Sequence, residues 1–224
     1  MLVVASPIEA RAVVAGAGGG PEPQAWVLSA LSPGLELLVT GIGKANAAGA
    51  TARFAQPGDH DLILNIGIAG SLGQPAIGDV VIASASVFAD EGLQSPDGFQ
   101  DCAAMGFPLA GFPGSAVPVS SEAVQWCRSW LSSLSPVVAP VATVSTCSGE
   151  NVLAAEVQRR TGAAAEGMEG AAVGLVGFRL GLPFAEIRVI SNTTGDRPSQ
   201  KWDMKVALAR LTEVIGALAQ AMRG

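Results

Sequence analysis

The stretch Glu166-Gly167-Met168-Glu169-Gly170-Ala171-Ala172 places two carboxylates three residues apart, where the sequence begins to predict a buried helix. Carboxylates are rarely left fully buried without a partner, so acids in such a run need an explanation. Glu166 and Glu169 could share an exposed strip of the helix at i, i+3 spacing, or they could serve a functional site. The rest of the chain decides between these two explanations.

The composition predicts one α/β domain that spans residues 1–224. This length allows a substantial core, and a content of 49% hydrophobic and 14% charged residues argues against disorder. The net charge of −6 argues against general binding to nucleic acid or to an anionic membrane. It leaves open a small anionic substrate, which needs only a local positive field.

No metal site, cofactor or disulfide scaffold is expected. The three cysteines form no C-x-x-C pair, and His60 is the only histidine. The apolar run Met1–Ala5 lacks a basic leader and is followed by Pro7, which favours a first strand over a signal peptide. No uninterrupted apolar run reaches membrane-spanning length, so we expect a cytoplasmic protein.

Apolar strands alternate with helical segments, which predicts a mixed, mostly parallel sheet that is covered on both faces. Strands are expected at 1–5, 24–31, 35–40, 61–66, 80–89, 137–145 and 184–190. Helices are expected at 7–15, 45–55, 120–134, 148–161, 169–180 and 199–222. Residues 92–118 are rich in Gly and Pro and predict a long loop. Pro140 predicts a strand that is bent or lies at an edge.

Polar residues follow several of these strands. In open α/β sheets, ligands bind outside the carboxyl ends of the strands. Such positions are Glu9, residues 67–71, Asp90-Glu91, residues 145–148 and Ser191-Asn192. We therefore expect a binding site at this edge of the sheet.

Six motifs, in their order and spacing, resemble the nucleoside phosphorylase/nucleosidase family, and together they cover nearly the whole chain. They are Ser6-Pro7-Ile8-Glu9, Thr40-Gly41-Ile42-Gly43-Lys44, Asn65-Ile66-Gly67-Ile68-Ala69-Gly70-Ser71, Ile77-Gly78-Asp79-Val80-Val81, Glu166-x-Met168-Glu169-Gly170-Ala171-Ala172 and Arg188-Val189-Ile190-Ser191-Asn192. The resemblance implies a three-layer α/β/α fold with a twisted mixed sheet. It also implies a site at a subunit interface, and hence a homo-oligomer that is a dimer or larger.

Within this family the chain resembles the N-glycoside hydrolases, both the methylthioadenosine/S-adenosylhomocysteine nucleosidases and, more closely, the futalosine hydrolases. The resemblance implies that futalosine and water give hypoxanthine and dehypoxanthinylfutalosine, in menaquinone biosynthesis. Cleavage of a purine N-glycosidic bond passes through an oxocarbenium-like state. The enzyme must orient a water, grip the ribose hydroxyls and neutralise the departing base.

The resemblance implies that Glu9 is the base that activates the water. The backbone of Ile68, Ala69 and Gly70 would help to hold the water and the sugar face. The alternative for Glu9 is an acid that interacts with the positive end of a helix macrodipole.

The resemblance implies that Glu169 accepts hydrogen bonds from the ribose 2′- and 3′-hydroxyls, with Met168 beside the sugar. The alternative for Glu169 is a solvated surface position. Glu166 is expected to be structural.

Asn192, which follows Ser191 at a strand end, departs from the adenine-specific nucleosidases, where this position is an aspartate. An amide oxygen can accept a hydrogen bond from a protonated purine N7, while its nitrogen donates to a 6-oxo group. This pattern favours hypoxanthine or guanine over adenine. The alternative is that Asn192 caps the strand end.

The resemblance places Trp202 at the wall of the pocket for the 5′ substituent. Phe107 and Phe112 could contribute from a neighbouring subunit or be ordinary core residues. Arg197 or Lys201 could meet a carboxylate on the substituent or lie on the surface.

A purine nucleoside phosphorylase on the same fold would need cationic groups around a phosphate. None of the strand-end motifs places an arginine next to residues 67–70, and Glu9 would repel the anion, so hydrolysis is favoured. A methylthioadenosine-type nucleosidase stays open. A non-catalytic nucleoside-binding protein would be expected to lack Glu9 or Glu169, and both are present.

Overall fold

A nine-stranded sheet forms the middle layer of the computed structural model, which describes residues 1–223. The strands are β1 (Leu2–Val4), β2 (Leu28–Ser32), β3 (Leu35–Val39), β4 (Ile63–Ser71), β5 (Val80–Phe88), β8 (Ala116–Pro118), β9 (Val137–Thr143), β10 (Ala165–Gly167) and β11 (Phe184–Thr193). Their order is β10-β9-β5-β11-β4-β1-β3-β2, with β8 beside β5. Parallel pairings join β3, β1, β4 and β11, and also β5, β9 and β10.

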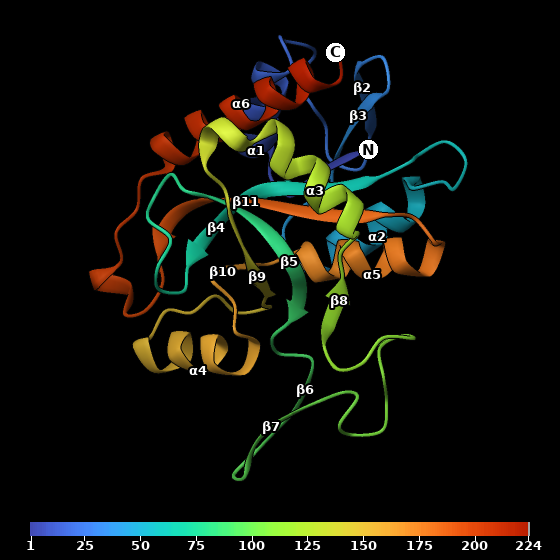
Figure 1. Cartoon of the computed structure of the whole chain (residues 1–224). Helices are drawn as coiled ribbons and strands as arrows, with labels where there is room; N and C mark the ends of the chain where they lie inside the picture. The colour runs from blue at the N-terminus through green and yellow to red at the C-terminus, as the bar shows by residue number, and fades with distance from the viewer. Residues whose placement is uncertain (224) are drawn as a thin grey trace.

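Helices cover both faces of the sheet, as Figure 1 shows. They are α1 (Pro7–Gly16), α2 (Lys44–Phe54), α3 (Ser121–Trp130), α4 (Asn151–Thr161), α5 (Gly170–Leu180) and α6 (Met204–Ala221). Helices α1, α3 and α6 pack on one face and α2 and α5 on the other, because their apolar residues join two separate buried clusters. This arrangement confirms the expected three-layer α/β/α fold.

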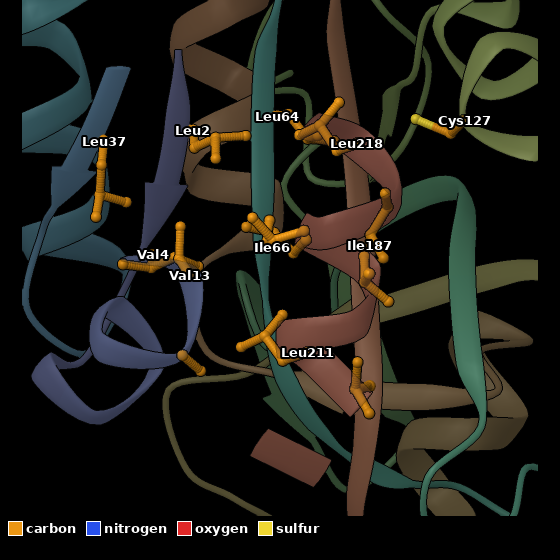
Figure 2. Packing of buried hydrophobic residues seen from close by; sticks show 14 of the residues in the cluster. Leu2, Val4, Val13, Leu37, Leu64, Ile66, Cys127, Ile187, Leu211 and Leu218 are labelled. Carbon is orange, nitrogen blue, oxygen red and sulfur yellow. The ribbon is translucent and has the colours of Figure 1, made fainter. Parts of the chain in front are cut away.

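The larger cluster lies between the sheet and helices α1 and α6 (Figure 2). Alternate residues of β4, Leu64 and Ile66, point toward this side together with Ile187 of β11. The other residues of these two strands therefore point toward α2 and α5, since successive side chains of a strand alternate between its faces. The polar residues Asn65, Glu186 and Arg188 of these strands lie on that second side.

Strand β10 closes part of the sheet on itself. It is parallel to β9 and also antiparallel to the end of β4, where Glu166 pairs with Gly70. The strands β4, β11, β5, β9 and β10 thus form a continuous ring of pairings. This closure brings the stretch 165–169 against the carboxyl end of β4.

Several predicted boundaries were wrong. The strand expected from residue 24 begins at Leu28, the helix expected from 148 begins at Asn151, the helix expected to end at 134 ends at Trp130, and the strand expected to end at 190 runs to Thr193. Residues 67–71 belong to β4 and do not follow it, so the glycines of this stretch lie inside a strand. The predicted loop 92–118 contains the hairpin β6 (Gly92–Ser95) and β7 (Gly98–Asp101), which projects from the sheet in Figure 1, and then β8. The last helix begins at Met204, not at residue 199.

Pro140 does not mark a sheet edge, because β9 lies between β5 and β10. The expected bend takes the form of a register shift on β5. Ala83 is opposite Ala139, but Ser86 is opposite Val141, so extra residues of β5 face the proline. A bulge accommodates a residue that cannot donate a hydrogen bond to the ladder.

Candidate active site

Glu9 is held in place by the start of α1. Ser6 caps this helix, and the Ser6 backbone N–H and Oγ–H donate to Oε2 of Glu9 at 2.8 and 2.7 Å. Oε1 accepts from the backbone N–H of Ile68 on β4 at 2.9 Å. Glu9 is only 4% exposed, so it is a buried carboxylate whose two oxygens are both anchored. The capping box explains its orientation and does not exclude a chemical role.

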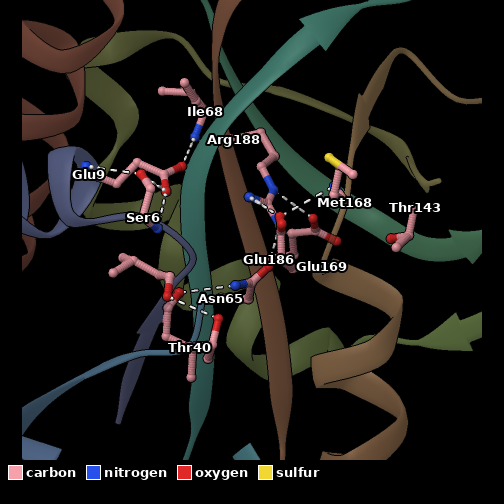
Figure 3. A network of polar contacts seen from close by, with 12 residues as sticks. Ser6, Glu9, Thr40, Asn65, Ile68, Thr143, Met168, Glu169, Glu186 and Arg188 are labelled. Atoms are coloured by element: carbon pink, nitrogen blue, oxygen red, sulfur yellow. Dashed lines mark hydrogen bonds and ion pairs between the residues drawn. The ribbon is translucent and has the colours of Figure 1, made fainter. Parts of the chain in front are cut away.

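Strand register brings four polar or small residues together on one face of β4 and β11. Glu186 lies opposite Asn65, and Arg188 lies opposite Gly67. Nε of Arg188 donates to Oε1 of Glu186 at 2.7 Å, and Nη2 donates to Oδ1 of Asn65. Figure 3 shows this network beside Glu9 and Glu169. The charged side chains of Glu186 and Arg188 are both completely buried.

Gly67 provides the space in which Glu9 and Arg188 approach each other. A Cβ at this position would overlap Oε1 of Glu9 and would lie 2.8 Å from Nη1 of Arg188. The backbone of Gly67 is an ordinary strand conformation, so the position requires a glycine for space. The expectation that no arginine borders residues 67–70 was therefore wrong.

Glu169 precedes α5 and is buried, so the surface alternative for this residue was wrong. Its Oε1 accepts from the backbone N–H of Gly43 at 2.9 Å, and its Oε2 lies 3.8 Å from Nη1 of Arg188. Gly43 has a φ of 92°, a conformation that favours glycine. The turn before α2 thus presents a backbone donor to Glu169.

The surroundings of Glu169 disfavour its charge. Burial raises the pKa of Glu169, the charge of Arg188 and the Gly43 amide oppose this rise, and the charge of Glu9 adds to it. For Arg188, burial acts to lower the pKa, but Glu186 and Glu169 outweigh it and raise the pKa. The cluster therefore consists of one guanidinium that stays charged among three carboxylates.

Glu166 and Glu169 do not share a helix face. Glu166 is on β10, buried, and accepts hydrogen bonds from the backbone N–H and Oγ of Ser148 at 2.7 and 2.6 Å. These bonds tie the segment before α4 to β10. Glu166 accordingly has a structural set of contacts, as expected.

Asn192 lies at a bulge of β11. The register with β4 shifts between Ile190 and Asn192, so Asn192 is opposite Gly70. Its Oδ1 accepts from Oγ of Ser191 at 2.8 Å, and its Nδ2 donates to the Thr193 carbonyl at 2.9 Å. These contacts use one lone pair and one N–H of the amide, so one further lone pair and one N–H can meet a ligand.

Trp202 lies next to Asn192, with which it forms an antiparallel bridge. It is 47% exposed, and its Nε1 donates to Oε1 of Gln200 at 3.0 Å. The guanidinium of Arg197 lies 4.8 Å from its ring centroid. Of the two phenylalanines in the 92–118 segment, Phe112 is buried against Phe178, whereas Phe107 is 72% exposed.

The remaining predicted residues line the same segment of the sheet. Ile68 and Ala69 turn their side chains into hydrophobic clusters, so only their backbone is offered to a ligand. Met168 is partly buried, and its side chain packs on the cluster that includes Leu72 and Val144. The predicted residues thus form three groups, around Glu9, Glu169 and Asn192, that residues 67–70 of β4 connect.

Sequence reasoning gave no role to Arg188, Glu186 or Asn65. A signal was present, because Glu186 and Arg188 alternate with Ile187 and Val189 in a strand that is otherwise apolar. Opposite charges at i, i+2 of a buried strand lie on the same face and can pair. Such a pair indicates a charged cluster inside the sheet.

Other features of the described residues do not compete with this site. Residues 1–223 contain no group of three or more His, Cys, Asp or Glu side chains that could hold a metal ion. None of their helices combines the length and apolar character needed to cross a membrane. A cavity of about 1250 Å³ lies at the amino ends of β1, β3 and β4, away from Gly67–Gly70, and is lined by residues such as Leu62 and Trp126.

Glu169→Gln tests the electrostatic description of this site through stability. Because the pKa of Glu169 is raised in the folded state, the stability linked to its protonation is present at acidic pH. It is lost as the pH rises through the raised pKa. The variant avoids this loss, so its melting temperature is expected to rise relative to that of the wild type as the pH increases above about 4.3, the ordinary pKa of a glutamate.

The matched control is Glu156→Gln. Glu156 is partly exposed and hydrogen-bonded to Arg159, and its pKa is lowered by that bond. Thermal unfolding across the pH series measures both variants. The description would be contradicted if the melting temperature of Glu169→Gln, relative to that of the wild type, stayed constant or fell as the pH rises.

Comparison with known proteins agrees with the fold. A sequence profile described as "Phosphorylase superfamily" matches residues 34–222. A futalosine hydrolase of Acidothermus cellulolyticus is 36% identical over 225 residues, which cover 99% of this chain and 90% of that protein. A 5′-methylthioadenosine/S-adenosylhomocysteine nucleosidase of Shewanella halifaxensis is 32% identical over 178 residues, which cover 74% of this chain and 72% of that protein.

A solved structure shares the fold. It is a 5′-methylthioadenosine/S-adenosylhomocysteine nucleosidase of Colwellia psychrerythraea in complex with adenine. The TM-score is 0.78 at 20% identity, over 98% of this chain and 93% of that chain. The profile match over most of the chain and the similarity of the relatives agree. The chain belongs to the phosphorylase superfamily.

Proposed function

We propose that this chain is an N-glycoside hydrolase that cleaves futalosine with water to hypoxanthine and dehypoxanthinylfutalosine, in menaquinone biosynthesis. The observation that carries the proposal is the pair of buried carboxylates on either side of Arg188. Glu9 is anchored at Gly67-Ile68, and Glu169 at Gly43. Glycosidic cleavage needs two such groups in different environments, one for the water and one for the sugar.

In this proposal Glu9 activates the water. Its Oε1 accepts from the Ile68 amide and lies above Gly67, close to Nη1 of Arg188. Glu169 accepts hydrogen bonds from the ribose 2′- and 3′-hydroxyls through its Oε2. This oxygen accepts from the Met168 amide at 3.2 Å and lies 3.8 Å from Arg188, so it keeps a lone pair. Contacts of a carboxylate with the ribose hydroxyls strengthen as positive charge develops on the sugar, which favours the transition state.

Charge pairing favours hydrolysis over phosphorolysis. Two cations on the Glu9–Glu169 side of the site are already paired: Arg188 with Glu186, and Lys44 with Asp90 and with Glu91 at 3.0 Å. A phosphate dianion would have to displace these carboxylates and approach Glu9. Water carries no charge and meets no such cost, which supports a hydrolase.

The identity of the base and of the 5′ substituent is proposed from Asn192 and Trp202. The free lone pair and N–H of the Asn192 amide match a protonated N7 and a 6-oxo group, the pattern of hypoxanthine. Trp202, half-exposed beside Asn192 with Arg197 against its ring, is proposed to border the 5′ substituent. The relative named futalosine hydrolase also matches more of this chain than the methylthioadenosine nucleosidase does.

We further propose a cytoplasmic homo-oligomer. Ile42, in the turn that holds Glu169, and Phe107 are strongly exposed apolar side chains, and burial of such residues favours association. A molar mass in solution well above the 22.5 kDa of one chain is expected, and light scattering measures it. A stable monomer would contradict the oligomer.

A substrate panel tests the main proposal. Purified protein is incubated with futalosine, inosine and methylthioadenosine, with and without phosphate, and the released base is separated by chromatography. We expect hypoxanthine from futalosine at a rate that phosphate does not change. Glu9→Gln should abolish release, whereas Glu22→Gln, at an exposed carboxylate paired with Arg11, should not. Preferential release of adenine, or a requirement for phosphate, would refute the proposal.

Asn192→Asp tests the reading of the purine. A carboxylate has no N–H to donate to a 6-oxo group and can accept from a 6-amino group. The ratio of kcat/KM for 6-amino over 6-oxo nucleosides is therefore expected to rise by at least about tenfold. Both substrates share the ribose, so the ratio is insensitive to a general loss of activity. An unchanged ratio would show that Asn192 does not contact the base edge.

A further inference from the structure

Glu186 is a fully buried carboxylate that the proposed chemistry does not use. Its Oε1 accepts from Nε of Arg188 at 2.7 Å, and its Oε2 accepts from Oγ of Ser86 on β5. A buried ion pair is often no more stabilising than apolar residues of the same volume. The interior position of Glu186 therefore suggests a role in the electrostatics of the site.

Gly170 makes room for this carboxylate. A Cβ on Gly170 would overlap both carboxylate oxygens of Glu186. The backbone of Gly170 is at the start of α5 and is not left-handed, so the glycine is needed for space. Gly170 directly follows Glu169, so the residue that admits Glu186 is the neighbour of the proposed ribose ligand.

Arg188 lies between Glu186 and Glu169 and is hydrogen-bonded only to Glu186, whereas Glu169 is a more distant ion-pair partner. Its Nε–H donates to Glu186 at 2.7 Å, whereas its Nη1 is 3.8 Å from Oε2 of Glu169. A direct bidentate ion pair with Arg188 would occupy the lone pairs of Glu169. Oε1 of Glu169 accepts from the Gly43 amide, and Oε2 accepts from the Met168 amide. Because Arg188 is oriented toward Glu186, each oxygen keeps one lone pair for a ligand.

We propose that Glu186 is a positioning residue, which holds the guanidinium of Arg188 away from Glu169 and keeps the ribose site negative. This inference rests on the proposed function, because it concerns the ribose site of a glycosidic cleavage. Glu9, Glu169 and Glu186 with Arg188 carry a formal charge of −2 when all four are ionised. Loss of Glu186 leaves −1.

This charge acts on the transition state more than on the bound substrate. The ribose of the substrate is neutral, whereas the oxocarbenium-like transition state is cationic. A buried negative cluster that is fixed in advance lowers the barrier without tightening ground-state binding to the same degree. The effect of Glu186 should therefore fall on kcat, with little change in KM.

Glu186→Gln is the direct test, because glutamine keeps the size and can still accept from Arg188. We expect kcat to fall about 100-fold with little change in KM. The acidic limb of the kcat/KM profile should also move to lower pH. The charges that act on Glu169 are those of Arg188 on β11 and Glu9 on α1, and the titratable Cys147 thiol is also near it. Glu186 acts on Glu169 through Arg188, so loss of the Glu186 charge leaves more of the Arg188 field on Glu169.

Two control variants separate this role from a structural one. Ser86→Ala removes the hydroxyl contact of Glu186 but keeps its charge, so kcat and the acidic limb should stay near the wild type. Glu186→Asp keeps the charge and should restore the wild-type acidic limb. A folded Glu186→Gln with unchanged kcat and pH profile would overturn the proposal. Equal losses in Ser86→Ala and Glu186→Gln would do so as well.

If Glu186→Gln does not fold, Gly170→Ala tests the same role through kcat and the acidic limb. The added methyl group displaces the Glu186 carboxylate from Arg188. A lower kcat with a shifted acidic limb supports the proposal, and a wild-type profile overturns it. The kinetic constants of all these variants are compared with those of the wild type on whichever nucleoside the wild type hydrolyses. Failure to cleave futalosine thus refutes the proposed substrate without deciding the role of Glu186.

Binding provides a readout that needs no turnover. The probes are a nucleoside analogue with a cationic pyrrolidine in place of the ribose, and the neutral ribose nucleoside. Calorimetry on Glu186→Gln should show affinity for the cationic analogue reduced at least about tenfold more than affinity for the neutral one. Equal reductions for both probes would overturn the proposal.

Discussion

A single cation in the interior of the sheet, Arg188, constrains the residues around it. Moving a guanidinium out of water is costly, and the cost is offset only by close partners that satisfy its donors. Glu186 and Asn65 supply these partners from β11 and β4. Gly67 leaves room for the guanidinium, and Gly170 leaves room for Glu186. Replacing any of these residues affects a charge that cannot reach solvent.

The elements that were predicted correctly are those with local signals. Apolar runs located most strands, and Ser6-Pro7 before Glu9 is a helix start whose capping geometry the structure contains. The family resemblance then placed Glu9, Glu169 and Asn192 on separate elements. The structure brings Glu9 and Glu169 to opposite sides of Arg188 and leaves Asn192 farther along β11, opposite Gly70 of β4.

The errors came from glycines and from long-range pairing. Gly41 and Gly43 have positive φ and make a turn. Gly67 and Gly70 instead lie in a strand, where other side chains occupy the space that a Cβ would need. Closely spaced glycines can thus indicate either a turn or a crowded strand. The sequence does not distinguish the two, so residues 67–71 were predicted to follow the strand. Likewise, β10 pairs with β4, almost a hundred residues earlier, and no local signal indicates that Glu166 belongs to a strand.

The same charge distribution accounts for both selectivity and rate. A cluster with more carboxylates than cations disfavours an anionic nucleophile such as phosphate and favours water. It also favours a sugar that becomes cationic as the bond breaks. The cost is borne by the folded state, in which burial raises the pKa of Glu169 above its ordinary value. A site built to stabilise a transient cation is therefore electrostatically unfavourable while it is empty, and the apolar core on the opposite face of the sheet must offset that cost.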